Sequence, residues 1–489
     1  MNENIFREYD IRGIVDEDLT PESVATLAHA IGTFFARNGA RRVAVGYDAR
    51  ESSPFFFELL SRGFNDCGVD VVSIGMVPTP VLYHTAFTKP VDGGVMITGS
   101  HNPANHNGFK ICLGKSTLFG PQIQEIKQIA LALSPGFSRP AATAGGEASL
   151  NERTSSSCDG PPEGGTQNGG TQSGTIETVS VLDDYVADVV AGIRMGPRRL
   201  RAVVDGGNGM GGVTAVPVYR ALGVDLVELY TEPDSRFPNH HPDPTVTENL
   251  IDVIEAVTAY EADLGIAFDG DGDRIGVVDE TGRIIWGDEL MVLLSRSILA
   301  ERPGATIIAE VKCSQNLFDD IARHGGTPVM WKAGHSLIKS KMKETNAALA
   351  GEMSGHIFFA DRFYGFDDAT YAGARLLEIL SSTDLRLSEL LADLPPSVST
   401  PELRVPCPDE LKFDIVARVS DHFSRTNEVI TIDGARILFE HGWGLVRASN
   451  TQAILVLRFE ADSPEHLDEI RDIVEHKVDE FISAAAAAN

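Results

Sequence analysis

Three aspartates separated by single glycines form the segment of this sequence with the clearest chemistry, Asp269-Gly-Asp-Gly-Asp-Arg274. The apolar runs 264–268 and 275–278 flank it and predict two short strands. Glycine lets the backbone turn tightly, so the three carboxylates can converge on one point. A hard divalent cation with oxygen ligands, usually Mg²⁺, relieves their mutual repulsion. The segment therefore predicts a metal site.

A second loop supplies a nucleophile. The run Gly94–Thr98 predicts a buried strand that leads into Gly99-Ser-His-Asn-Pro103, where a hydroxyl stands beside an imidazole. Phosphoryl transfer requires a nucleophile, a metal ion and cationic side chains around the phosphate. Ser100 and the three aspartates supply the first two, so the two loops together favour phosphoryl transfer.

Two alternatives fit single motifs. The aspartate loop resembles the start of an EF-hand with Glu280 at its twelfth position, but Arg274 stands where that loop needs glycine. The turn Gly207-Asn-Gly-Met-Gly-Gly212 follows a predicted strand at 200–204 and fits the dinucleotide-binding pattern, with Glu228 near the distance of a ribose-binding acid. An NAD-dependent oxidoreductase is therefore the rival function, and a glycine-rich turn from strand to helix is the structural explanation.

Five segments together resemble the α-D-phosphohexomutase family, in the family's order. They are Phe6-Arg-Glu-Tyr-Asp-Ile-Arg-Gly13, Thr98-Gly-Ser-His-Asn-Pro103, Asp269-Gly-Asp-Gly-Asp-Arg274, Gly351-Glu-Met-Ser-Gly-His356 and Arg447-Ala-Ser-Asn-Thr451. They span nearly the whole chain, which is most similar to the bacterial phosphomannomutase/phosphoglucomutase group. The resemblance implies an enzyme that interconverts hexose 1-phosphate and hexose 6-phosphate through a phosphoserine. A hexose 1,6-bisphosphate would be both the intermediate and an activator.

The resemblance also implies roles for individual residues. The metal site would hold Mg²⁺ between phosphorylated Ser100, Asp269, Asp271 and Asp273. The catalytic set would be Ser100, His101, Arg12, Lys110, Arg274, Lys312 and His335. The substrate would contact Tyr9, Lys312, His335, Glu352, Ser354, His356, Arg447, Ser449, Asn450 and Thr451. Which of the cationic residues acts as general acid or base stays open, because several of them fit that role.

The sugar-binding loop bears on the substrate. By resemblance, Glu352 and Ser354 would hold the O3 and O4 hydroxyls, whose configuration glucose and mannose share. Phosphoglucosamine mutases, the alternative within the family, usually carry Gln where this chain has Met353. The loop therefore favours mannose and glucose phosphates.

Composition limits the partners and the compartment. The formal net charge of −29 argues against nucleic acids and anionic membrane surfaces. The sequence has no apolar run of the ~20 residues that a membrane span requires, and no apolar signal core at its start. Its five cysteines are scattered, which fits a reducing cytoplasm. We expect a cytoplasmic monomer or homodimer with a phosphosugar as its substrate.

A chain of 489 residues predicts three or four domains that must position these loops. Strands alternate with helical patterns as far as residue ~398, and each block places an apolar strand before a functional loop, which predicts three α/β domains with mixed or parallel sheets. The last ~90 residues predict an α+β domain. We expect domains at 1–138, 179–283, 284–398 and 399–489 around one central cleft. A Gly/Ser/Thr/Pro-rich flexible insertion would occupy 139–178.

Overall fold

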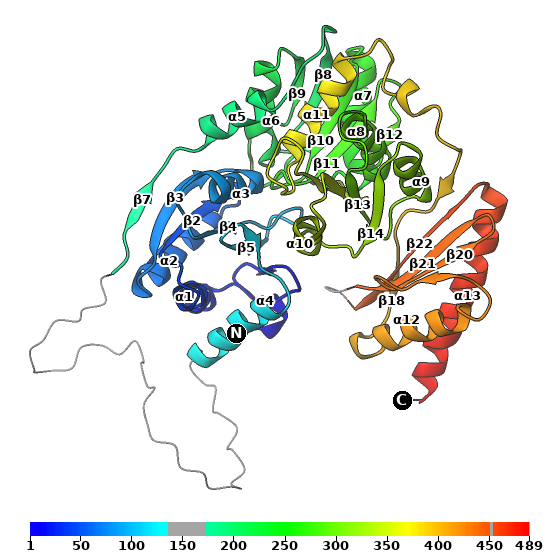
Figure 1. The fold of residues 1–489 in the computed structure, drawn as a ribbon. Helices are drawn as coiled ribbons and strands as arrows, with labels where there is room; N and C mark the ends of the chain where they lie inside the picture. Colours follow the sequence, from blue (N-terminus) through cyan, green and yellow to red (C-terminus); the bar gives the residue numbers. More distant parts are fainter. Residues whose placement is uncertain (135–172, 450–452, 489) are drawn as a thin grey trace, which may run out of the picture.

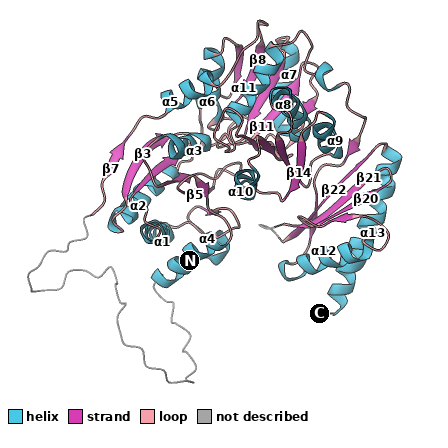
Figure 2. Ribbon diagram, in the orientation of Figure 1, coloured by secondary structure: helices cyan, strands magenta, loops and turns pink. Residues whose placement is uncertain are grey.

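The computed structural model describes residues 1–134, 173–449 and 453–488. Four domains, I to IV in chain order, follow one another in an arc (Figure 1). Domains I to III are each built on a mixed sheet, and domain IV on an antiparallel sheet with two helices (Figure 2). The predicted fold class, three α/β domains followed by an α+β domain, is confirmed.

Domain I contains a sheet in the order β1-β5-β4-β2-β3-β7, with β6 beside β5. Its strands are β1 (Ile11–Ile14), β2 (Arg42–Tyr47), β3 (Asp70–Met76), β4 (Gly93–Ile97), β5 (His106–Leu113), β6 (Ser116–Thr117) and β7 (Ile176–Thr178). Its helices are α1 (Pro21–Arg37), α2 (Ser53–Asp66), α3 (Thr79–Thr88) and α4 (Pro121–Leu133), after a 3-10 turn at Glu3–Ile5. Strands β2, β3, β4 and β7 run parallel, whereas β5 is antiparallel to β4.

The segment expected to be an insertion, 139–178, lies outside the described residues as far as position 172. Its final residues include β7, which pairs in parallel with β3 at the edge of the domain I sheet. The chain therefore enters domain II from that edge.

Domain II has the strand order β12-β11-β10-β8-β9. Its strands are β8 (Arg201–Asp205), β9 (Asp225–Leu229), β10 (Leu264–Phe268), β11 (Ile275–Asp279) and β12 (Ile284–Ile285). Its helices are α5 (Leu182–Ala191), α6 (Gly211–Ala221) and α7 (Ile251–Ala259), with a 3-10 turn at Thr247–Leu250. The strands β8 to β10 are parallel and β11 is antiparallel to β10.

Domain III repeats this plan with the order β14-β13-β15-β16. Its strands are β13 (Thr306–Glu310), β14 (Thr327–Trp331), β15 (Leu349–Gly351) and β16 (Ile357–Phe359). Its helices are α8 (Gly287–Glu301), α9 (Gln315–Arg323), α10 (His335–Thr345) and α11 (Ala369–Ser381), followed by a 3-10 turn at Glu389–Leu391. Helix α11 lies against α6 of domain II, and the Tyr219 hydroxyl donates to the Thr370 carbonyl over 3.1 Å (Figure 1).

Domain IV forms the end of the arc. Its sheet runs β17-β22-β21-β20-β19, with β18 also paired to β22. The strands are β17 (Val398–Ser399), β18 (Leu403–Pro406), β19 (Val429–Ile430), β20 (Ala435–Phe439), β21 (Gly442–Ala448) and β22 (Ile454–Ala461), and the helices are α12 (Asp409–Phe423) and α13 (Pro464–Ala488). Both helices pack on one face of the sheet, and Trp443 and Leu445 on the other face contact Val311 of domain III.

One turn type recurs in domains I to III. In each, the last parallel strand bends back into an antiparallel neighbour, from β4 to β5, β10 to β11 and β15 to β16. These three turns are the serine loop (residues 98–103), the aspartate loop (269–274) and the sugar-binding loop (351–356) inferred from sequence. Equivalent positions in three similar domains therefore carry the candidate functional groups.

The apolar core connects these three domains. One continuous cluster of buried side chains runs from Ala44 and Met96 of domain I through Ile266 of domain II to Ile307 and Leu377 of domain III. Domain IV has a separate core between its sheet and its two helices. One cluster therefore joins domains I to III, while domain I also has a large core of its own on the other side of its sheet, around residues such as Phe35, Val45 and Phe64.

Candidate active site

The serine loop is held in an unusual backbone conformation. Ser100 has φ of 48°, in the left-handed region that costs a non-glycine residue free energy. The buried guanidinium of Arg50 holds the loop by donating to the carbonyls of Ser100 and Asn102 over 2.8 and 2.6 Å. The Asp48 carboxylate accepts from Gly99 N over 3.2 Å. Contacts from the end of β2 thus fix the serine.

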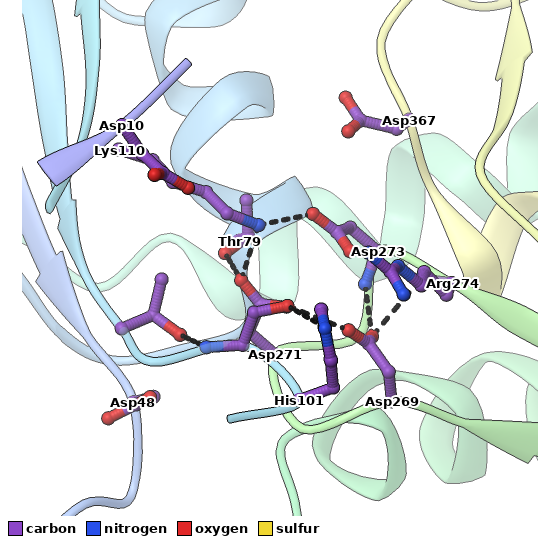
Figure 3. A network of polar contacts seen from close by, with 12 residues as sticks. Asp10, Asp48, Thr79, His101, Lys110, Asp269, Asp271, Asp273, Arg274 and Asp367 are labelled. Carbon is purple, nitrogen blue, oxygen red and sulfur yellow. Dashed lines mark hydrogen bonds and ion pairs between the residues drawn. The ribbon is translucent and has the colours of Figure 1, made fainter. Parts of the chain in front are cut away.

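The aspartate loop packs directly on the serine loop. A Cβ at Gly270 would stand 2.3 Å from the Ser100 carbonyl oxygen, so glycine is required for this approach. Within the loop, Asp269 Oδ1 accepts from the backbone N–H groups of Asp273 and Arg274 over 3.0 and 3.1 Å (Figure 3). The backbone itself therefore orients the first aspartate.

The two loops bring the hydroxyl and the carboxylates together. Ser100 is 1 % exposed, and its Oγ donates to Asp269 Oδ2 over 3.0 Å. On its other side, Oγ lies 3.2 Å from His101 Nδ1. Burial, followed by the nearby Arg274 and Arg12, lowers the pKa of His101 well below its usual value. Ser100 thus lies between a carboxylate and a neutral imidazole.

All three aspartates are buried, and cationic or polar groups of domain I contact them. The Lys110 ammonium from β5 pairs with Asp271 over 2.7 Å and also with Asp273 (Figure 3). Thr79, at the start of α3, donates its hydroxyl to Asp271. Burial favours the neutral amine, but the two carboxylates outweigh it and raise the pKa of Lys110. Domain I therefore neutralises part of the negative charge of the domain II loop.

These carboxylates fit a divalent cation. One oxygen from each of Asp269, Asp271 and Asp273 lies within 4.8 Å of the others. Burial and the two neighbouring aspartates raise the pKa of Asp269 well above its usual value. Asp271 Oδ1 is buried and has no hydrogen-bond partner among the described residues. Hard oxygen ligands in this arrangement suit Mg²⁺.

The EF-hand alternative is wrong for this loop. Strands β10 and β11 flank it, where an EF-hand requires helices. Glu280, the twelfth position, bonds to Ser388 instead of facing the aspartates.

The sugar-binding loop joins the aspartate loop through His356. Its Nδ1 lies 2.7 Å from Glu352 Oε2 and its Nε2 lies 3.2 Å from Asp273 Oδ1. Burial opposes protonation, but Asp273 outweighs it and raises the pKa of His356 to about 9. The imidazolium therefore bridges the two loops. Arg274 reaches the same ring, and Ser354 Oγ lies 3.4 Å from its Nδ1.

Glu352 is fixed from a second side, since its Oε1 accepts from Gly334 N over 2.7 Å. Burial favours the neutral acid, but the hydrogen bond from His356 outweighs it and lowers the pKa of Glu352 to about 2. Glu352 is thus an ionised acceptor in the sugar-binding loop.

His335 begins helix α10 and meets domain I. Its ring packs edge-on against Tyr9 at 5.8 Å, and the Tyr9 hydroxyl donates to the Ala333 carbonyl over 3.1 Å. Burial, reinforced by Lys339, lowers the pKa of His335 well below its usual value. Its Nδ1 is 3.6 Å from Asp367 Oδ2. A neutral, buried imidazole therefore lies where domains I and III meet.

Lys312 of domain III and Arg447 of domain IV lie where these two domains meet. Lys312 pairs with Glu402 and lies 3.4 Å from Glu310. Arg447 pairs with Asp433 over 3.0 Å, and the same carboxylate accepts from Ala333 N over 3.1 Å. A short polar chain therefore connects Arg447 to the backbone beside His335.

Of the remaining predicted residues, Arg12 lies near His101 and helps to lower its pKa, Ser449 directly follows β21, and the last two lie outside the described residues. Arg12, in β1, donates to Asp10 over 2.6 Å. Ser449 follows β21, and its N–H donates to Ile454 O over 3.1 Å. Asn450 and Thr451 lie outside the described residues.

Sequence reasoning missed the residues that support these loops. Besides Asp48 and Arg50, two arginines of domain IV grip the loop that carries Lys312. Arg458 donates to the Lys312 carbonyl over 2.6 Å, and Arg436 donates to Val311 O over 2.6 Å and Cys313 O over 2.9 Å. The Arg436 guanidinium lies 3.8 Å from the centre of the Trp443 ring. For Asp48 the sequence did contain a usable signal. An acidic residue ends or directly follows the first parallel strand in each of domains I to III, namely Asp48, Asp205 and Glu310.

The glycine-rich turn is a packing feature. A Cβ at Gly209 would stand 2.8 Å from Gly270, and one at Gly211 would stand 2.3 Å from Phe268. Glu228, the expected ribose-binding acid, pairs with Arg220. The turn therefore places α6 against the aspartate loop.

Models of four domain families match the chain. They are phosphoglucomutase/phosphomannomutase alpha/beta/alpha domain I at residues 3–135, domain II at 183–282, domain III at 286–398, and the C-terminal domain at 402–477. Together they define a four-domain protein of the α-D-phosphohexomutase class.

Relatives place the chain more narrowly. A phosphomannomutase/phosphoglucomutase of Pseudomonas aeruginosa is 44% identical over 476 residues, which cover 97% of this chain and 95% of the relative. A phosphoglucomutase of Neisseria meningitidis is 43% identical over 474 residues, with 96% and 95% covered. A crystal structure of a phosphoglucomutase/phosphomannomutase family protein from Burkholderia thailandensis has a TM-score of 0.86 at 41% identity, with 98% of both chains covered. The chain belongs to the α-D-phosphohexomutase family, among its bacterial phosphomannomutase/phosphoglucomutases. No helix within the described residues has the length and apolar character to cross a membrane.

Proposed function

We propose that the protein interconverts hexose 1-phosphates and hexose 6-phosphates, acting on both mannose and glucose phosphates through a phosphoserine at Ser100. The names of its relatives support this activity. The observation that carries the mechanism is the 3.0 Å contact between Ser100 Oγ and Asp269 Oδ2 within a loop of three buried carboxylates. A hydroxyl in that position is suited to carry a phosphoryl group.

The reaction comprises two transfers. In the first, the P–O bond to Ser100 breaks, a P–O bond to the free sugar hydroxyl forms, and that hydroxyl loses its proton to a base. The product is a hexose 1,6-bisphosphate, which turns over in the site. In the second transfer, its other phosphoryl group returns to Ser100, and the proton is given to the sugar oxygen that is released. Added hexose 1,6-bisphosphate would phosphorylate an enzyme that has lost its phosphate.

Asp269, Asp271 and Asp273 would hold Mg²⁺ together with the phosphate on Ser100. When bound, the ion neutralises charge on the phosphoryl oxygens. Lys110 and Arg274 add positive charge from two sides of the same loop, where they stabilise the charge of the moving group.

We assign proton transfer to His335. The alternatives Lys110 and Lys312 are each paired with two carboxylates, which favour their charged forms. His335 is neutral and buried beside Tyr9, so its imidazole can accept the proton of the attacking hydroxyl. Glu352 and Ser354 would bind the sugar hydroxyls. Arg447, with Ser449 and the expected Asn450 and Thr451, would bind the phosphate that is not reacting.

The test combines substrate kinetics with protein chemistry. We expect comparable kcat/KM for mannose 1-phosphate and glucose 1-phosphate, and a much lower value for glucosamine 1-phosphate. Mass spectrometry of the purified protein should place one phosphate on Ser100. Activity confined to glucosamine 1-phosphate, or phosphate on another residue in the active enzyme, would contradict the proposal.

A further inference from the structure

A compact group of metal-ligating side chains lies on domain IV, away from the active-site loops. His441 occupies the turn between β20 and β21, Asp462 follows β22, and His466 belongs to the first turn of α13. One ligand atom from each of the three lies within 4.8 Å of the other two. All three side chains are more than one-third exposed, so an ion from solvent can reach them.

The two imidazoles share one carboxylate. His441 Nδ1 lies 3.1 Å from Asp462 Oδ2, and His466 Nδ1 contacts Asp462 Oδ1. The two rings are stacked, with centroids 3.9 Å apart and planes inclined by 6°. Both Nδ1 atoms therefore point to the same side, toward the carboxylate. In each contact a proton lies between an imidazole nitrogen and a carboxylate oxygen. Both of these atoms could act as metal ligands.

The backbone holds these three positions in place. Asp462 N donates to His441 O over 3.0 Å, directly beyond the Gly442–Ala461 pair that ends the β21–β22 ladder. His466 N donates to the Ser463 hydroxyl over 3.3 Å at the start of α13. Sheet and helix thus fix the ligands before any ion binds, which reduces the entropy that binding costs.

The local charge favours a cation. No lysine or arginine among the described residues forms an ion pair with Asp462, whose partners are the two histidines. The carboxylates of Glu465 and Glu469, from the same helix, add negative charge near His466. A divalent cation bound between the two rings would therefore lie in a locally negative environment.

We propose that His441, Asp462 and His466 form a second metal site, selective for a divalent transition-metal ion such as Zn²⁺ or Ni²⁺. Two imidazole nitrogens and one carboxylate oxygen suit these ions, whereas Mg²⁺ prefers oxygen ligands throughout. The ion would bind to the two Nδ1 atoms, each neutral ring would carry its proton on Nε2 instead, and water would complete the coordination. The site would fasten the β20–β21 turn to the first turn of α13 and so stabilise domain IV.

The test is a Ni²⁺ titration of the full chain by calorimetry, with excess Mg²⁺ present to occupy the aspartate loop. The wild-type protein should bind one equivalent of Ni²⁺. Its dissociation constant should be at least about tenfold lower than that of the double variant His441→Ala, His466→Ala. His476→Ala is the matched control, because it removes an exposed histidine from the same helix but outside the group. Mutase activity with Mg²⁺ should be equal in all three proteins, which separates this site from the active site.

A second measurement concerns stability. Ni²⁺ should raise the melting temperature of the wild-type protein and of His476→Ala, but not that of the double variant. Equal Ni²⁺ affinity in the wild-type protein and the double variant would overturn the proposal. So would an equal loss in His476→Ala, since the binding would then belong to surface imidazoles in general.

Discussion

Ser100 combines a left-handed backbone, almost complete burial and a hydroxyl between a carboxylate and an imidazole. A strained residue persists only where its surroundings hold it, and here Arg50 and Asp48 do so. The strain aims the hydroxyl at the aspartate loop. At the scale of single residues, the site therefore depends on supporting contacts as much as on the reactive groups.

Ser100→Ala should lower mutase kcat by at least about three orders of magnitude, because among the described residues the Ser100 hydroxyl is the one that contacts Asp269. The fold should persist, since alanine fits the same space and the loop contacts involve the backbone of residue 100. The measurement is a coupled mutase assay, with circular dichroism as the control for folding. Bound sugar bisphosphate must first be removed. Turnover near that of the wild type would rule out the phosphoserine mechanism.

His335→Gln should lower kcat by about 10²- to 10⁴-fold if this imidazole moves the proton. Burial lowers the pKa of His335, so the neutral base persists to a lower pH than in an ordinary histidine. The wild-type kcat/KM should therefore fall only when the pH drops through that lowered pKa. The acidic limb due to this group should be missing in the variant. An unchanged pH profile would transfer the role to Lys110, Lys312 or Arg12.

At the scale of elements, the sequence predicted the strands that lead into the serine and aspartate loops. Apolar runs that end in glycine-rich polar loops identified β4, β10 and their loops, because buried strands and tight turns have strong local signals. The supporting arginines could not be predicted. Arg436 and Arg458 lie in strands, where a charged residue usually indicates a solvent-facing position. Their burial depends on domain III, which no local pattern in β20 or β22 reveals.

Arg458→Ala should reduce kcat/KM by roughly ten- to hundred-fold, because a buried charge-assisted hydrogen bond contributes about 1.5–3 kcal/mol. The lost bond holds the Lys312 carbonyl and thereby orients that side chain. Arg458→Lys should restore part of the activity. The exposed Arg425→Ala in the same domain is the control. A lower melting temperature without any change in kcat/KM would assign Arg458 to stability alone.

At the scale of the whole molecule, the sequence predicted four domains, whereas the shared interior of domains I to III emerged only from the structure. Side chains far apart in sequence form that core, such as Ala44, Ile266 and Leu377. Contacts of this kind leave no local pattern. The residues of the candidate active site also come from all four domains. Arg447 therefore joins the other residues only when domain IV lies against domain III.

Arg447→Ala should impair both reaction directions, because the phosphate that we propose it binds is the non-reacting one in each transfer. Loss of this contact should reduce kcat/KM roughly ten- to hundred-fold in each direction. A weaker grip should also release more hexose bisphosphate per turnover. Both quantities can be measured against the wild type. If kcat/KM and the release of hexose bisphosphate were both unchanged, Arg447 would not bind the phosphate and would have only a structural role in domain IV.

The separate core of domain IV also has a mechanical consequence. A pulling force applied between the two termini must pass from domain III to domain IV. There, the small apolar cluster of Val311, Trp443 and Leu445 and the two arginine grips carry the load. The continuous interior of domains I to III resists extension over a much larger buried surface. Under tension, domain IV should therefore detach first as an intact unit, leaving a three-domain body that yields at higher force.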